Sequence, residues 1–432
     1  MIFVCSNAFG QGSPPGKPAA PAGTNVVQLT PALINQWAEE MAAKNPALLA
    51  ADARTNAAGA GVTAVRTWDD PTARVGGIAA REQMRAEDGD LLYGVEQRLP
   101  LFGKPKLARK AALAGLAAQT ANATYQFQIQ KRELAKTAFR TALADEIIFI
   151  GSQDLEWLET FSRTVEQKYA AGQGTVVEVS QVQNDRARRA TQLETDRKQL
   201  TQERVILNRL LGRDLETPWP SLALPEVAGQ IVYNQKLVEF AMKYEPRIKL
   251  LEQEIARAEA GVNLARGQRL PDVSVGLEGR NYSGNGSFRQ GAMVLSVNLP
   301  WVNGGKYRSE IRREEANLRA AQLDLDDYKL TVQQEVHDLV LRIDAARRQI
   351  LLYQDEIIPR TEKALESARI AWEANRGSFR DVLDARRMLL EGRLMRAREM
   401  AEQYQLMSEL VLCCGLGDLE ALQMLGALPE EK

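Results

Sequence analysis

Hydrophobic side chains recur every seven positions along residues 306–372. One row of them is joined by a second row displaced by three or four positions, and the two rows are Ile311, Leu318, Leu325, Val332, Leu339 and Val336, Ile343, Ile350, Ile357. Such paired rows are typical of a helix that packs on another helix in a supercoil. The segment has no glycine and only one proline, Pro359. It therefore predicts one helix on the order of 100 Å long. Charged and amide residues fill the intervening positions, so this helix needs neighbouring helices rather than a globular core.

The long helix is half of a hairpin, and the hairpin occurs twice. After a turn at 375–377 a second helix returns to Gly415, and earlier in the chain residues 104–169 and a helix ending at Gly212 flank a turn at 172–174. Landmarks recur 200 to 204 positions apart, in the pairs Asn45-Pro46/Glu245-Pro246, Ala60-Gly61-Val62/Ala260-Gly261-Val262, Leu99-Pro100/Leu299-Pro300, Gly174/Gly377, Val179/Val382, Gly212/Gly415 and Asp214-Leu215-Glu216/Asp418-Leu419-Glu420. The chain is therefore interpreted as a tandem duplication of one unit.

Between the helices the hydrophobic period changes from about 3.5 residues to two. Alternation of apolar with polar or small residues predicts strands at 72–83 and 90–99 in the first copy and at 272–282 and 290–299 in the second. Leu91, Tyr93 and Val95 lie on one such face, and Val273, Val275 and Leu277 on another. The connections 84–89 and 283–287 are polar and glycine-containing, which indicates turns.

The remaining segments complete the division of the chain. Residues 31–66 predict one helix, which Asp70-Pro71 follows. We expect the first repeat at 26–216, a proline-containing linker at 217–233, the second repeat at 234–420 and a C-terminal tail at 421–432. The fold class is mainly α, with four strands contributed by two pairs of strands.

Residues 1–25 are rich in glycine, proline and alanine and have no periodicity. Ile2-Phe3-Val4-Cys5 followed by Ala8-Phe9-Gly10 resembles the end of a secretory signal with cleavage after Gly10. The alternative is an ordinary disordered N-terminal segment. Val4 is too large for the position before a lipidated cysteine, so we expect no lipid on Cys5.

Composition excludes several classes of function. The net charge is −1, which argues against a nucleic-acid-binding protein. The sequence contains no run of about 18 apolar residues, which a transmembrane helix would need. There is no phosphate-binding loop, no metal-ligand spacing and no nucleophile with a base partner, so we expect no enzyme activity, no cofactor and no resident metal. The only histidine, His337, is interpreted as a packing or surface residue.

The four strands suggest where the chain resides. Each is about ten residues long, which spans an outer membrane when the strand is tilted. Each has one apolar and one polar face, as a wall between lipid and water requires. Four strands cannot close a barrel, and open edges in lipid leave backbone groups unpaired, so other subunits must close it. The alternative is a small soluble sheet that caps a coiled-coil protein.

The chain resembles the TolC family of outer-membrane efflux proteins over residues 30–420. Leu99-Pro-Leu-Phe-Gly-Lys104 and Ile358-Pro359 are similar to the heavy-metal CzcC branch, and Trp372-Glu-Ala-Asn-Arg-Gly377-Ser-Phe-Arg-Asp-Val-Leu-Asp-Ala385 resembles the turn signature of the family. The resemblance implies a homotrimer with a roughly twelve-stranded barrel, continued by a helical tunnel. It further implies a passive exit duct in the outer membrane, with a periplasmic adaptor and an inner-membrane pump of the RND type as partners, and a heavy metal or a drug as the substrate. The alternative hypothesis is a cytoplasmic coiled-coil scaffold, but it leaves the paired strands unexplained.

The same resemblance assigns candidate residues. Asp381 and Asp384 lie three positions apart on one helical face, and three copies would place six carboxylates at a periplasmic gate. Capping of the helix is the alternative role, because acids near a helix N-terminus are favoured by the dipole. Trp372 and Arg376 are further gate candidates, although the arginine of the family is displaced here and Trp372 replaces a tyrosine. The expected adaptor-docking tips are Gly172, Gly174, Thr175, Gly377 and Ser378.

Overall fold

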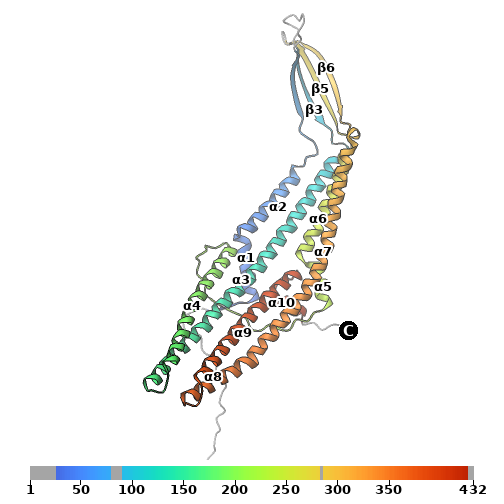
Figure 1. Ribbon diagram of the computed structural model, residues 1–432. Coiled ribbons are helices and arrows are strands. Elements are labelled where there is room, and N and C mark those ends of the chain that lie inside the picture. The colour runs from blue at the N-terminus through green and yellow to red at the C-terminus, as the bar shows by residue number, and fades with distance from the viewer. Residues whose placement is uncertain (1–25, 79–89, 283–285, 427–432) are drawn as a thin grey trace, which may run out of the picture.

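The computed structural model describes residues 26–78, 90–282 and 286–426 as an elongated molecule with strands at one end and helical turns at the other (Figure 1). The helices are α1 (Pro31–Lys44), α2 (Pro46–Ala64), α3 (Lys104–Ala170), α4 (Val176–Leu211), α5 (Gln235–Tyr244), α6 (Pro246–Gln268), α7 (Gly304–Leu351), α8 (Ile358–Glu373), α9 (Phe379–Cys413) and α10 (Leu419–Gly426). The strands are β1 (Val26–Gln28), β2 (Thr72–Ile78), β3 (Asp90–Arg98), β4 (Ser221–Ala223), β5 (Val273–Tyr282) and β6 (Phe288–Val297).

The larger sheet joins the two copies. Its strand order is β2-β3-β5-β6, and every neighbouring pair is antiparallel. The alternating pattern correctly predicted strands at these four places, although residues 79–83 and the turn residues 84–89 and 283–285 lie outside the described residues. The register places Val95 beside Leu277 and Leu277 beside Met293, so the apolar side chains of successive strands share one face. This face is exposed within the single chain.

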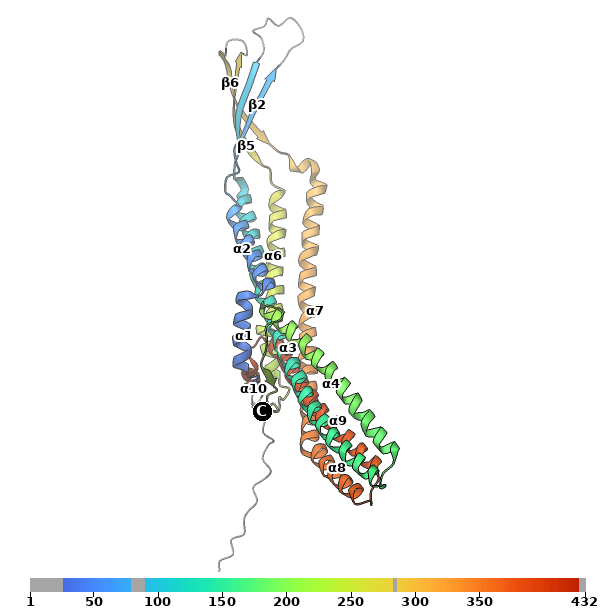
Figure 2. The ribbon, with the colours of Figure 1, turned by 90° about the vertical axis from the view of Figure 1, so that its left-hand side faces the viewer.

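The helices below the sheet form two successive groups along the length of the molecule. Near the sheet, α2, α3, α6 and α7 run side by side, and further down α3 and α4 lie beside α8 and α9 (Figure 2). The predicted seven-residue seam is confirmed in α7, because its row residues Leu325, Val332, Leu339 and Ile343 are buried. Those residues contribute to the main core, which continues into α3, α4 and α9.

The prediction of one helix at 31–66 is wrong, because the helix is interrupted at Asn45 and forms two helices, α1 and α2. Pro46 has no amide hydrogen and disfavours helical geometry in the residue before it, so α1 ends and α2 begins there. The Asn45 Oδ1 atom accepts from the Ala47 amide at 2.8 Å, and Nδ2 donates to the Leu210 carbonyl at 2.7 Å. In the second copy Glu245 takes this position between α5 and α6, and its carboxylate accepts from the Ile248 amide at 2.6 Å.

A glycine ends the return helix beside each of these breaks. Gly212 follows α4 with a φ of 68°, and Gly415 follows α9 with a φ of 60°. A Cβ atom on Gly212 would lie 2.6 Å from the Lys44 carbonyl oxygen, and one on Gly415 would lie even closer to the Tyr244 carbonyl oxygen. The left-handed conformation and the close backbone approach therefore both require glycine.

The long arm of the second copy is less regular than its hydrophobic rows predict. A π-helical segment, Leu352–Ile357, separates α7 from α8. It ends two residues before Pro359, whose missing amide hydrogen and bulky ring disrupt the regular hydrogen bonding of an α-helix. Gly392 of α9 lies opposite, within about 4 Å of Tyr353, Ile357 and Ile358 if a Cβ is placed on it. The widened turn therefore packs where the facing helix has no side chain.

The segment between the repeats also packs against the core. β1 and β4 form a two-stranded parallel sheet that the sequence analysis did not identify. In residues 217–233, where a linker was expected, Trp219, Leu222, Ala228 and Ile231 are buried in the main core. The Trp219 ring meets Trp37 of α1 edge-on at 5.1 Å between centroids. The segment is therefore a packed part of the core rather than a free tether.

We predict that alanine at Gly212 or Gly415 lowers the thermal stability of the protein. Each substitution forces a side chain into the left-handed region, at about 1–2 kcal/mol, and against a backbone carbonyl. The matched control is Gly229→Ala, because no atom lies within 4 Å of a Cβ at that position. Melting followed by circular dichroism measures the effect, and equal melting temperatures for all three variants would contradict the interpretation of these breaks.

Candidate functional site

The turn between α8 and α9 is tightly closed at the end of the molecule opposite the sheet. Asn375 adopts a left-handed conformation with a φ of 58°, and the amides of Arg376 and Gly377 both donate to the Ala371 carbonyl, at 2.8 and 3.0 Å. A Cβ atom on Gly377 would lie 2.9 Å from the Ala371 Cβ atom. Ser378 caps α9 through its hydroxyl, which accepts from the Arg380 amide at 3.2 Å.

Asp381 and Asp384 lie on the exposed face of the first turns of α9. Their neighbours Val382, Leu383 and Ala385 point into the hairpin, so the two carboxylates point away from it. Asp384 lies 3.6 Å from Arg380 and 3.7 Å from Arg387. Within the part of the chain that the structure describes, Asp381 has no ion-pair partner and neither carboxylate accepts a backbone amide. Their favourable interaction with the helix is therefore limited to the dipole, because Ser378 supplies the capping hydrogen bond.

The other two gate candidates are placed differently from each other. Arg376 is exposed in the turn. Trp372 is only 5% exposed and packs between Phe161 of α3 and Phe379 of α9, with ring centroids 5.1 and 5.8 Å away. In the single chain its indole therefore fills the small core of the tips rather than facing an opening.

The other turn, between α3 and α4, has the same design. Gly172 takes the left-handed position with a φ of 73°, and a Cβ atom on Gly174 would lie 3.2 Å from the Tyr169 amide nitrogen. Thr175 and Glu178 form a capping box, in which the Glu178 carboxylate accepts from the Thr175 amide at 2.8 Å. Both turns are thus short and rich in small residues, and they lie close together at the end remote from the sheet (Figures 1 and 2).

Lys168 joins the two turns, and the sequence analysis missed it. From the last turn of α3, its ammonium donates to the Trp372 carbonyl and to the Asn375 side-chain oxygen, both at 2.7 Å. It also lies 4.5 Å from the centroid of the Trp372 ring. Charge-assisted hydrogen bonds and a cation–π contact therefore hold the second turn against the first.

A buried cluster of charges ties the same helices together further from the turns. Arg386 of α9, with a side chain only 7% exposed, donates to both Asp154 carboxylate oxygens at 2.9 and 2.8 Å. Its third contact is Asp185 of α4 at 3.2 Å, and Arg189 reaches Asp154 at 3.4 Å. One arginine thus connects α3, α4 and α9. Nothing in the local sequence identifies this cluster, because its members lie up to 232 positions apart.

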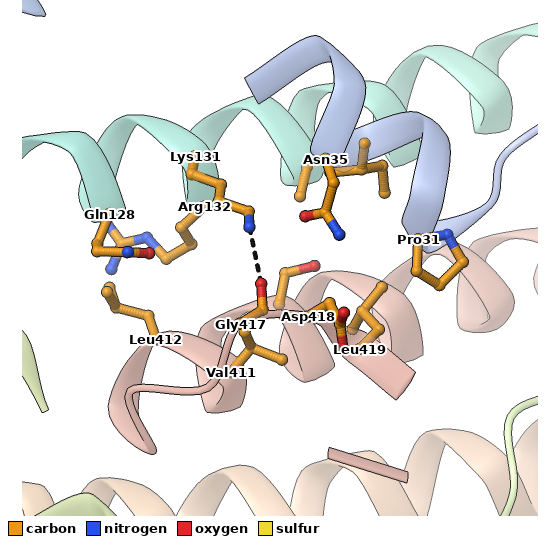
Figure 3. Close-up of a pocket in the computed structure, with 13 residues that line it drawn as sticks. Pro31, Asn35, Gln128, Lys131, Arg132, Val411, Leu412, Gly417, Asp418 and Leu419 are labelled. Atoms are coloured by element: carbon orange, nitrogen blue, oxygen red, sulfur yellow. Dashed lines mark hydrogen bonds between the residues drawn. The ribbon is translucent and has the colours of Figure 1, made fainter. Parts of the chain in front are cut away.

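A small pocket lies between α1, α3 and the end of α9 (Figure 3). Lys131 projects into it and donates to the Gly417 carbonyl at 2.7 Å. Burial lowers the pKa of Lys131, while the charge of Asp418 acts in the opposite direction. Apolar side chains such as Ile34, Val411 and Leu419 line the pocket together with polar ones such as Asn35 and Gln128. The hydrogen bond from Lys131 joins α3 to the segment after α9, which is a structural contact.

The remaining residues that could bind a metal ion or a membrane were also located in the structure. His337 is exposed and meets the Tyr233 ring edge-on at 5.1 Å, as expected for a surface residue. Among the described residues, no three histidine, cysteine, aspartate or glutamate side chains gather as a metal site would require. None of the described helices has an apolar stretch long enough to cross a membrane.

Comparison with known proteins matches both repeats to one family. The sequence profile of the family described as outer membrane efflux protein matches residues 37–213 and 237–411. The chain is 26% identical over 254 residues to the pyoverdine export outer membrane protein OpmQ of Pseudomonas aeruginosa, covering 56% of this chain and 51% of that protein. It is 20% identical over 281 residues to the cobalt-zinc-cadmium resistance protein CzcC of Cupriavidus metallidurans, covering 64% and 65%. The match therefore spans only about half to two thirds of these relatives.

The fold is shared with solved structures over nearly the whole chain. A crystal structure of CusC superposes with a TM-score of 0.79, covering 93% of this chain and 98% of that one, at 17% identity. At this identity the similarity establishes the fold alone.

We predict that Arg386→Met strongly destabilises the contact between the hairpins. Removing the arginine leaves the Asp154 and Asp185 carboxylates buried without their main partner, at about 3–5 kcal/mol. The control is Arg387→Met, whose side chain is largely exposed and should cost no more than about 1 kcal/mol. Denaturant unfolding compares the two variants, and a similar loss of stability in both would remove the special role of Arg386.

Proposed function

The chain belongs to the outer membrane efflux protein family, and we propose that it is a passive export duct whose strands span the outer membrane as part of a homotrimer. The observation that carries this proposal is the four-stranded sheet, which exposes an apolar face and leaves the outer edges of β2 and β6 unpaired in the described chain. Enzyme activity is not part of the proposal.

The two faces of the sheet differ as a wall between lipid and water requires. The face with Val95, Leu277 and Met293 is apolar and exposed, with Met293 76% accessible. On the opposite face Glu96 pairs with Arg74 and accepts from the Ser274 hydroxyl. Polar groups that satisfy one another on that face suit a water-filled lumen, and the apolar face suits the acyl chains.

The unpaired edges account for the proposed trimer. Unpaired backbone groups within a bilayer cost several kcal/mol each, so an open four-stranded sheet cannot remain in lipid. Pairing of β2 with β6 of a neighbouring copy repeats the antiparallel order, and three copies close a roughly twelve-stranded barrel. The rival, a cytoplasmic coiled-coil scaffold, explains the hairpins but gives no role to an exposed apolar sheet.

The helices below the sheet would form a periplasmic tunnel that ends at the two turns. We propose that the turns, with Gly172, Gly174, Thr175, Gly377 and Ser378, dock a periplasmic adaptor that connects to an inner-membrane pump of the RND type. Their position, farthest from the sheet, and their small residues support this. The named relatives export pyoverdine or confer cobalt, zinc and cadmium resistance. We place the substrate of this duct in one of these two classes, an organic molecule or a heavy-metal ion.

Asp381 and Asp384 are proposed to line the periplasmic mouth of the tunnel. Both point away from their own hairpin, and three copies would bring six carboxylates together. Carboxylates crowded at a narrow mouth attract cations and repel one another. Arg376 is exposed beside them, whereas Trp372 would act indirectly by holding the turn.

We predict that Leu295→Arg blocks assembly of the trimer, whereas Ser296→Arg is tolerated. An arginine facing the acyl chains near the bilayer midplane costs about 2–4 kcal/mol, and the neighbouring position faces the polar side of the sheet. Mass measurement of the protein in detergent reports assembly. A stable folded monomer of the unmodified protein, or equal behaviour of the two variants, would refute the membrane placement.

We predict that replacing both Asp381 and Asp384 with alanine weakens block of the pore by divalent and trivalent cations. The substitution removes the carboxylates that would bridge a cation, so the blocking concentration in planar-bilayer recordings should rise at least about tenfold. Asp324→Ala with Asp327→Ala is the matched control, because these aspartates have the same spacing on the exposed face of α7. An unchanged blocking concentration in the first variant would restrict Asp381 and Asp384 to a helix-dipole role.

A further inference from the structure

Exposed aromatic side chains surround the junction between the sheet and the helices. Trp68, in the connection from α2 to β2, is 55% exposed. Phe102, between β3 and α3, is 52% exposed, and Trp301, between β6 and α7, is 64% exposed. These three residues are called the collar below. Tryptophan is highly buried on average, and exposed apolar side chains that are grouped together mark interaction sites.

Phe102 is held outward by an unusual backbone conformation. Its φ of 56° and ψ of 15° lie in the left-handed region, and the following Gly103 also has a positive φ of 69°. A bulky residue rarely adopts this conformation without compensation. About half of Phe102 remains accessible to solvent within the single chain, so part of the ring is free to meet a partner outside it.

The second copy repeats the arrangement. Pro100-Leu101-Phe102 and Pro300-Trp301-Val302 both follow a strand, form a short turn and precede a long helix. In each turn the two residues after the proline are exposed and apolar. The three segments that carry the collar residues all connect the sheet to the helices, so the collar lies at this junction (Figure 2).

Positive charge is concentrated immediately below the collar. The segments 64–70, 98–112, 262–272 and 298–313 contain 12 lysine and arginine residues but only 4 aspartate and glutamate residues, in a chain with a net charge of −1. In α3, Lys106, Arg109 and Lys110 are followed by no acidic residue before Glu133. Lys106 lies in the first turn of α3, where the positive end of the helix dipole disfavours a cation unless an anionic surface faces it.

Lys104 differs from these cations because it is already paired. Its ammonium donates to the Asp272 carboxylate at 2.7 Å and to the Leu270 carbonyl at 2.6 Å. Lys106, Arg109 and Lys110 have no ion-pair partner in the described part of the chain. Trp68, Lys104 and Lys306 also line one open pocket of about 660 Å³, so one collar residue lies beside the starts of α3 and α7.

The spacing of the two levels fits a membrane interface. At ~1.5 Å per residue, Lys106 to Lys110 lie roughly 5–10 Å below Gly103 along α3. The headgroup layer on one side of a bilayer is about 5–8 Å thick. Aromatic rings favour the boundary between the acyl chains and the headgroups, and cations favour the phosphates next to it.

We propose that the collar and the basic residues Lys106, Arg109 and Lys110 form a binding surface for anionic glycerophospholipids of the periplasmic leaflet. The aromatic rings insert at the glycerol level, and the cations bind the phosphate groups. This inference rests on the proposed membrane placement of the strands, and it adds a lipid preference that a membrane-spanning sheet by itself does not require.

Fluorescence quenching in vesicles tests the preference. The full-length protein is reconstituted in phosphatidylethanolamine vesicles that contain an equal fraction of either dibrominated phosphatidylglycerol or dibrominated phosphatidylcholine. The difference between the protein and its Trp68→Phe, Trp301→Phe variant isolates the collar signal. One cation near an anionic surface is worth about five-fold in binding, so quenching should favour phosphatidylglycerol by at least about three-fold. Equal quenching by the two lipids would overturn the proposal.

Matched charge variants identify the source of the preference. Lys106→Gln, Arg109→Gln, Lys110→Gln should abolish the preference for phosphatidylglycerol. Arg186→Gln, Arg188→Gln, Lys198→Gln removes the same charge from exposed positions of α4 and should retain it. Loss of the preference in both variants, or in neither, would overturn the assignment to α3.

A third variant separates this inference from the proposed function. Met293→Trp in the Trp68→Phe, Trp301→Phe background places a reporter in the middle of β6, where bromines deep in the acyl chains should quench it. Quenching there without selective quenching at the collar refutes only the lipid site. Absence of quenching at position 293 refutes the membrane placement itself, and with it the lipid site.

Discussion

The structure depends on one constraint, which is that the backbone groups along the free edges of β2 and β6 need hydrogen-bond partners. The sheet is contributed equally by the two repeats, and its outer strands are the first strand of the first copy and the last strand of the second. In lipid such edges must be paired, so the proposed membrane placement requires an assembly that closes the sheet. The same assembly determines which surfaces of the helices are finally buried. Exposed apolar residues on the helices, such as Leu323 and Leu330, are therefore expected at contacts between copies rather than in solvent.

Periodic features of the fold were predictable from the sequence because each is local. Alternation over ten residues fixes which side of a strand is apolar, and the seven-residue rows fix the buried side of α7. The duplication was visible because paired landmarks kept their spacing. The breaks were harder to predict. Asn45-Pro46 was recognised as a landmark but not as the end of a helix, and the π-helical segment before Pro359 required knowledge of the facing Gly392. The parallel pairing of β1 with β4 joins segments almost 200 residues apart, and their short length gives no periodic signal.

The candidate site was predictable to a different degree. Spacing alone placed Asp381 and Asp384 on one helical face, and the structure leaves that face exposed. Spacing could not show that Trp372 is buried against Phe161, or that Lys168 and Arg386 hold the two hairpins together. These contacts join residues more than 200 positions apart, and their energy depends on burial, which the sequence does not reveal. The tips are therefore a single packed unit, in which α8 and α9 cannot shift against α3 and α4 without breaking charged contacts at two levels.

Comparison of the two copies gives an argument about Asp381 that neither copy gives alone. A displacement of 203 positions relates Gly172 to Asn375, both left-handed, and Thr175 to Ser378, both N-caps. The same displacement relates Glu178 to Asp381.

In the first copy the Glu178 carboxylate completes the capping box by accepting from the Thr175 amide. In the second copy Ser378 caps the helix without help, and the shorter Asp381 side chain makes no such bond. The position thus has a structural role in one copy and lacks that role in the other. A carboxylate that its own helix does not use for capping is free to face the axis of an assembly. Helix capping therefore accounts for Glu178 but not for Asp381, which agrees with the proposed position of Asp381 at the periplasmic mouth of the tunnel.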